Sequence, residues 1–150
     1  MKPNIRSDLA KSLDVAWQRV SEAGTWWTGA ERVAIAAETR QAVHCELCLA
    51  RKQASSPAMV SGEHDKAVDL PRAAIEAIHR IRTDSGRLGQ GWYRSLIAAG
   101  LLEEHYVELL AVVSVVVATD TFHRAAGLPP RALSSAVPRQ HLWRRFEVVN

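Results

Sequence analysis

The sequence lacks an apolar run long enough to cross a membrane, and it carries no marked excess of charge. Its most apolar stretch, residues 109–118, is interrupted by Ser114 and is well short of the ~20 residues that a membrane helix needs. The first residues, Met-Lys-Pro-Asn-Ile-Arg-Ser-Asp, lack the apolar core of a signal peptide. A formal net charge of +3 over 150 residues gives no case for a basic nucleic-acid-binding face. We therefore expect a cytoplasmic protein that binds neither membranes nor nucleic acids.

Cysteine is equally scarce, because Cys45 and Cys48 are the only two. A single pair cannot form the disulfide framework that holds small secreted domains together. A chain of 150 residues, 47% of them hydrophobic, can bury a core without such a framework. In a cytosolic chain, the pair is therefore expected to be catalytic, redox-active or metal-binding rather than structural.

Helical spacing of apolar residues predicts an all-α, single-domain fold with no strand. Thr28 and Glu31 have the form of a capping box, and no Pro or Gly follows until after residue 54, which predicts one long helix. Residues 55–70 contain Pro, Gly, Ser and charged residues, which predicts a loop with a short helical turn. Gly100 and Gly127 mark later helix ends. The predicted helices span residues 8–23, 28–54, 71–82, 91–99 and 103–126.

The valine-rich segment 103–126 is too long for a typical strand and ends in Gly127-Leu-Pro-Pro, a helix-stop signal. A helix that is apolar nearly all round is expected to be buried, here on the cysteine helix, by the core or by a second subunit. Beyond it, three prolines predict an extended C-terminal arm. The expected division is therefore a helical domain over residues 1–130 and an arm over 131–150. Apolar arm residues expected to pack on the domain or on a second subunit are Leu142, Trp143 and Phe146.

The motif His44-Cys45-Glu46-Leu47-Cys48 places two thiols three residues apart. On one helix this spacing brings both sulfurs to the same face, close enough for a disulfide. Such a pair suits thiol chemistry, in which one thiolate attacks and the second resolves the oxidised product. Groups that lower a thiol pKa or move its proton are therefore sought nearby. The candidates are Glu38, two turns before Cys45, His44, four residues before Cys48, and His79 further along.

Other interpretations of these residues remain open. Two cysteines on a buried helix can be inert small hydrophobes. A zinc site completed by His64 or His79 is a second alternative, but no second ligand pair has the tight spacing typical of structural zinc, so no metal is predicted. The capping box already explains Glu31, and Lys52 fits a solvated helix charge.

Three stretches resemble the alkylhydroperoxidase D-like and carboxymuconolactone decarboxylase superfamily, and together they cover roughly residues 28–130. These are the helix from Glu31 to Cys48, the segment from His79 to Leu88, and the segment from Ala99 to Pro129. The resemblance implies an all-helical homo-oligomer without a cofactor. It also implies a small hydroperoxide substrate and an external dithiol protein as reductant. In such a site Cys48 would be the peroxidatic thiol and Cys45 the resolving one, with Glu38 as proton acceptor.

Two positions depart from the family pattern. The family glutamate twelve residues before the first cysteine is Val33 here, with Glu31 and Glu38 on either side. The family histidine four residues after the second cysteine is Lys52, a poor proton shuttle near neutral pH, so either His44 or His79 replaces it or the chemistry is weaker or different. Two other functions therefore stay open. One is a decarboxylase or lactone-processing enzyme that uses His79, His123 or arginines, and the other is a non-catalytic helical oligomer or redox sensor.

Overall fold

Every regular element between residues 5 and 138, the range that the computed structural model describes, is a helix, which confirms the all-α fold class. Three short 3-10 turns, η1 (Ala42–His44), η2 (Pro57–Met59) and η3 (Ser85–Arg87), connect longer elements. The α-helices are α1 (Ser7–Val20), α2 (Gly29–Gln41), α3 (Glu46–Gln53), α4 (Arg72–Asp84), α5 (Gln90–Ala98) and α6 (Glu103–Ala125).

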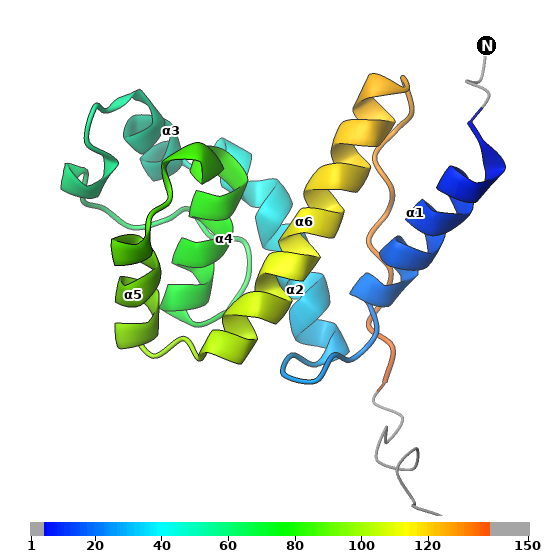
Figure 1. The fold of residues 1–150 in the computed structure, drawn as a ribbon, viewed down its shortest axis with the longest axis horizontal. Coiled ribbons are helices and arrows are strands. Elements are labelled where there is room, and N and C mark those ends of the chain that lie inside the picture. Colours follow the sequence, from blue (N-terminus) through cyan, green and yellow to red (C-terminus); the bar gives the residue numbers. More distant parts are fainter. Residues whose placement is uncertain (1–4, 139–150) are drawn as a thin grey trace, which may run out of the picture.

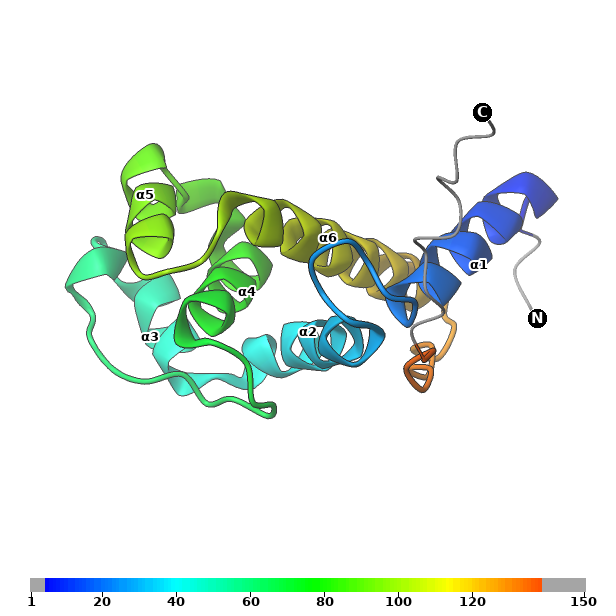
Figure 2. The same ribbon diagram turned by 90° about the horizontal axis from the view of Figure 1, so that it is seen from below.

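The long helix α6 organises the fold, because α1, α2 and α4 all pack against it (Figure 1). Figure 2 shows α1 at one end of the molecule and α3 and α5 at the other. Core side chains of α6 are Leu109, Val112, Val113 and Val116. The predicted packing of this helix on the cysteine helix is therefore confirmed for the α2 part. The helix that carries Cys48, α3, packs on α4 instead.

One side of α6 faces solvent, so the prediction of a helix buried all round is wrong for the single chain. The exposed stripe carries no charge between residues 107 and 121, and its members are Val107, Ala111, Ser114, Ala118 and Thr121. Contrary to the expectation that no segment is long and apolar enough to span a membrane, α6 meets both criteria by length and composition alone, with a mean hydropathy of 1.4. The other side of α6 packs against α1, α2 and α4, as the core helix of a globular domain does.

The predicted helix over residues 28–54 is broken at Cys45. The capping box is confirmed, since Thr28 and Glu31 bond to each other's backbone amides at the start of α2. At Cys45 the backbone is extended, with φ −71° and ψ 123°, and α3 begins at the next residue. The carboxylate of Asp65 accepts a 2.8 Å hydrogen bond from the Glu46 amide, which satisfies a free N–H at the new helix start. A contact made across the fold therefore stabilises the break.

The glycine stops predicted at Gly100 and Gly127 are confirmed, whereas the first helix, predicted to extend to residue 23 before a glycine, already ends at Val20. Gly100 follows α5 with φ +96° and Gly127 follows α6 with φ +66°, both in the left-handed region that favours glycine. In each case the next residue's amide bonds back to a carbonyl in the last turn, Leu96 and His123 respectively.

The first part of the C-terminal arm, residues 131–138, lies extended along α1 of the same chain. The Trp17 indole Nε1–H donates to the Ala132 carbonyl at 3.0 Å, and the Val137 amide donates to the Ser21 carbonyl at 2.8 Å. The predicted packing of Leu142, Trp143 and Phe146 on the domain or on a second subunit concerns residues outside the described range.

Replacing Val116 by Asp is expected to lower the free energy of unfolding by about 3 kcal/mol or more, because it places an unpaired charge in the core. Val15, 41% exposed on α1 and outside the uncharged stripe of α6, is the matched control, and its Asp variant should unfold within about 1 kcal/mol of the parent. Urea denaturation compares the three proteins. Equal losses in the two variants would show that α6 does not pack as described.

Assembly into a homo-oligomer stays a prediction, and the uncharged stripe of α6 is the surface that a second copy is expected to cover. Light scattering of the full-length chain at micromolar concentration should give a mass above the 16.6 kDa of one chain. Replacing Ala118 by Glu places a charge in the stripe and should shift the mass toward that value. A monomeric parent would refute the predicted oligomer. If the Glu variant is as oligomeric as the parent, the stripe is not the interface, but the oligomer itself remains.

Candidate functional site

The two cysteines meet at the start of α3. Cys45 is the residue that precedes the helix and Cys48 lies in its first turn, with 0% and 2% of their surfaces exposed. Both are free thiols. Amides at a helix start carry partial positive charge and favour a thiolate. Burial acts to raise the pKa of Cys45, but bonds from the Cys48 amide and from His64 outweigh it, and the pKa is lowered.

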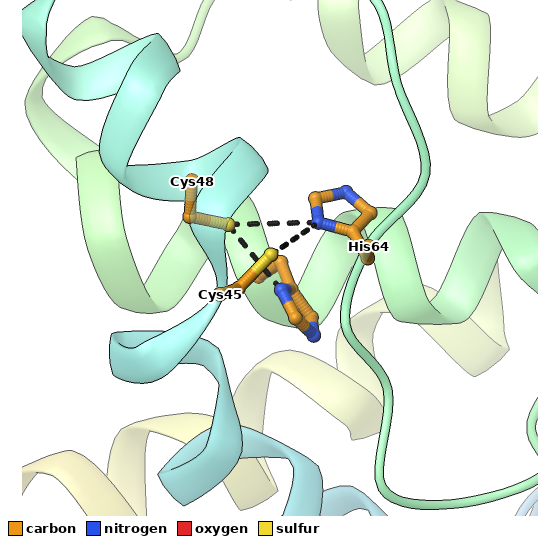
Figure 3. Close-up of side chains that lie close together, drawn as sticks. Cys45, Cys48 and His64 are labelled. Atoms are coloured by element: carbon orange, nitrogen blue, oxygen red, sulfur yellow. Dashed lines mark hydrogen bonds between the residues drawn. The ribbon is translucent and has the colours of Figure 1, made fainter.

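Two histidines direct the same ring nitrogen toward the sulfurs. His79, on α4, has its Nδ1 3.3 Å from the sulfur of Cys48. His64, on the loop after η2, has its Nδ1 3.5 Å from each of the two sulfurs. Figure 3 shows the two sulfurs and the His64 ring converging from separate segments. The two imidazoles lie with their centroids 4.2 Å apart.

Each histidine is held from behind by a carboxylate. His79 Nε2 lies 2.7 Å from Glu38 Oε1, and His64 Nε2 lies 2.7 Å from Glu76 Oε2. Arg51 also bonds to Glu76, at 2.9 Å. A carboxylate at Nε2 favours the tautomer that carries its proton there. The Nδ1 of a neutral ring then presents a lone pair to the sulfurs.

The carboxylate of Glu38 also holds the loop in place. Its Oε2 accepts hydrogen bonds from the amides of Ala67 and Val68, at 2.8 and 3.2 Å, and the side chain is fully buried. Asp65 binds the start of α3 a few residues earlier. His64 directly precedes Asp65, so these anchors fix its backbone beside the thiols.

The electrostatics of the two histidines differ. Burial lowers the pKa of His79, despite its bond to Glu38, so the ring is neutral near pH 7. Burial also opposes the charge on His64, but its bonds to Cys48, Glu76 and Cys45 raise its pKa to about 10. The pKa of Glu76 falls to about 2, since His64 and Arg51 overcome the effect of burial. One protonated and one neutral imidazole therefore touch the sulfur of Cys48.

Two cavities flank the cluster. One of about 120 Å³ is bordered by Cys48, Lys52 and Arg82. The other, of about 280 Å³, is bordered by His64, Glu76 and Arg51. Cys45 borders neither of them. Of the two cysteines, Cys48 is therefore the one that borders a cavity.

Four of the predicted site residues, Cys45, Cys48, Glu38 and His79, come together, but not in the predicted manner. The sulfurs are adjacent because the chain bends at Cys45, not because they share one face of a continuous helix. Glu38 meets His79 rather than a thiol. His44 is exposed on η1, and no hydrogen bond among residues 5–138 joins it to the cluster.

The positions of Lys52 and His123 also differ from those expected from the sequence. Lys52, which replaces the family histidine, borders the cavity at Cys48 with an exposed side chain. His123 bonds to the Pro129 carbonyl beyond α6 and to Arg131, apart from the thiols. The sequence predicts neither Glu76 nor Arg51 as a site residue, and it indicates His64 only as an alternative zinc ligand. His64 and Glu76 lie far from the cysteines along the chain, and Arg51, although three residues after Cys48, joins the site only through Glu76.

Ligand atoms suited to a soft metal also gather here. The two sulfurs and the two Nδ1 atoms of Cys45, Cys48, His64 and His79 all lie within 4.8 Å of one another. Compared with protein-family models, with curated proteins and with solved structures, the chain matches none. The site is therefore interpreted from its own chemistry.

Replacing Glu38 by Ala is expected to cost about 3 kcal/mol or more of unfolding free energy. The change leaves the Ala67 and Val68 amides and one His79 nitrogen without an acceptor, each at a cost of about 1–3 kcal/mol. Glu46, exposed at the start of α3, is the control, and its Ala variant should change stability by less than about 1 kcal/mol. Equal effects in urea denaturation would show that Glu38 is not an anchor.

Proposed function

We propose that this protein is a thiol-dependent peroxidase that reduces small hydroperoxides with the Cys45–Cys48 pair. One observation carries the proposal. The buried sulfur of Cys48 touches the Nδ1 atoms of two imidazoles, borders a small cavity, and has a second thiol beside it. A nucleophile, an acid, a base and a resolving thiol are the parts that peroxide reduction requires.

The first step uses both histidines on Cys48. The neutral His79 accepts the thiol proton at Nδ1, while Glu38 stabilises the imidazolium that forms. The thiolate attacks the terminal oxygen of the hydroperoxide, a sulfur–oxygen bond forms, and the oxygen–oxygen bond breaks. His64 gives its Nδ1 proton to the departing alkoxide. The products are an alcohol and a sulfenic acid on Cys48.

The second step forms the disulfide. His64, 3.5 Å from Cys45, now accepts that thiol's proton, and the Cys45 thiolate attacks the sulfenic sulfur. Hydroxide leaves and takes the proton held by His79, giving water. Two thiols and one hydroperoxide thus become a disulfide, an alcohol and water. An external dithiol protein, as expected in the reducing cytoplasm, returns the pair to thiols by exchange.

The position of Cys48 favours it as the attacking thiol. It borders the cavity of about 120 Å³, whereas Cys45 is fully enclosed between the α3 start, His64 and Cys48. A cavity of this size fits a small hydroperoxide, and Lys52 and Arg82 at its edge favour a substrate with a negative group. The decarboxylase alternative has less support, because His79 is held between Cys48 and Glu38 and His123 bonds to Pro129 and Arg131 instead.

The test is the rate at which reduced, metal-free protein loses both thiols to hydrogen peroxide. The folded protein should react far faster than its own urea-unfolded chain, and mass spectrometry should find a Cys45–Cys48 disulfide. Replacing Cys45 by Ser should leave a sulfenic acid that dimedone traps on Cys48. Replacing His79 by Gln should slow oxidation roughly 100-fold, as the loss of a general base does.

His44→Gln is the matched comparison, since this histidine neighbours Cys45 but lies outside the cluster. Its rate should equal that of the parent, whereas a loss like that of His79→Gln would restore the sequence-based assignment. If the folded thiols react with peroxide no faster than the unfolded ones, the proposed function is wrong.

A further inference from the structure

We propose that the reduced protein binds one zinc ion through Cys45, Cys48, His64 and His79. The four ligand atoms come from the α3 start, the loop after η2 and α4, yet all lie within 4.8 Å of one another. They form a two-cysteine, two-histidine set, the ligand combination that zinc takes in many structural sites. Zinc binding itself does not rest on the peroxidase proposal.

The spacing between ligand atoms is that of a tetrahedral zinc site. Zinc lies about 2.3 Å from a cysteine sulfur and about 2.0–2.1 Å from a histidine nitrogen. A tetrahedron with these bond lengths separates sulfur and nitrogen by about 3.6 Å. Three of the four sulfur–nitrogen distances are 3.3, 3.5 and 3.5 Å, and all other pairs of ligand atoms lie within 4.8 Å. A zinc ion between the four atoms therefore requires only a small adjustment.

The carboxylates behind the histidines match what metal-binding histidines need. Glu38 and Glu76 each bond an Nε2 at 2.7 Å, so both rings aim Nδ1 at the same centre. A carboxylate behind a ligating imidazole fixes its orientation and makes it a better donor. Arg51 in turn holds Glu76. Each histidine of the site is thus oriented by its own carboxylate.

Hydrogen bonding satisfies the four ligand atoms only in part. The Nδ1 of His64 lies 3.5 Å from both sulfurs, but one ring nitrogen holds at most one proton to share between them. A zinc ion bonds both thiolates and both nitrogens at once. It releases the two thiol protons and the proton on His64, and its two positive charges balance the two thiolates in a buried site.

Zinc binding would also regulate the thiols. A thiolate bonded to zinc shares the electron pair that a peroxide must accept, so the loaded protein resists oxidation. Once a disulfide forms, neither sulfur is a thiolate and zinc leaves. This protective effect rests on the proposed peroxidase chemistry.

Cobalt(II), a spectroscopic substitute for zinc, provides the test. Titrating reduced protein with cobalt chloride should give the intense visible bands of tetrahedral cobalt and a thiolate charge-transfer band, saturating at one ion per chain, and zinc should abolish both. Cys48→Ser and His64→Asn should each lose these bands. Glu76→Gln should weaken binding about 10- to 100-fold, as removal of such a supporting carboxylate does.

His44→Gln is the control and should bind like the parent. Circular dichroism checks that each variant is folded, and titration of the parent alone decides the proposal if a variant is not. The absence of thiolate charge-transfer bands in the parent would overturn it, as would unchanged binding in folded His64→Asn.

The two proposals fail separately. Zinc binding by a protein whose metal-free thiols ignore peroxide would leave a structural metal site and remove the peroxidase. Rapid peroxide oxidation without cobalt bands would support the peroxidase and exclude the metal site.

Discussion

The buried carboxylate of Glu38 is the contact on which the rest of the site depends. It is fully enclosed and accepts three hydrogen bonds, from His79 Nε2 and from the amides of Ala67 and Val68. These bonds orient one imidazole and hold the loop that delivers the other. A buried carboxylate is costly unless such partners satisfy it, so helix α2, helix α4 and the loop are held together at one point. The two thiols contact the imidazoles of His64 and His79 that are positioned in this way.

Much of the fold could be predicted from the sequence because its signals are local. The Thr28–Glu31 capping box and the glycine stops at Gly100 and Gly127 depend on neighbouring residues, and all three are confirmed. The break at Cys45 could not be predicted, since no Pro or Gly marks it and its stabilising contact comes from Asp65, far along the chain. For the same reason the cysteines were placed on one continuous helix, although they are adjacent in either arrangement.

The site was predicted only in part, and the reason is again the distance along the chain. Cys45 and Cys48 form a recognisable motif, and Glu38 and His79 were found as polar residues on predicted helices. His64 lies in an irregular loop, where its position depends on anchors that no pattern reveals. The sequence predicts no zinc site because no second ligand pair has tight spacing. Here two separate segments supply one histidine each, so the ligands converge without that spacing.

Thiol oxidation and metal binding both require that Glu38 direct the Nδ1 lone pair of His79 at Cys48. Nitrogen-15 NMR of the histidine rings in reduced, metal-free protein measures this tautomer directly. Our account predicts that neutral His79 carries its proton on Nε2, with a downfield shift typical of a strong hydrogen bond to a carboxylate. In Glu38→Gln that hydrogen-bond signature should weaken. A His79 ring protonated on Nδ1 in the parent would contradict the account, because its nitrogen would then offer neither a base to the thiol nor a ligand to a metal.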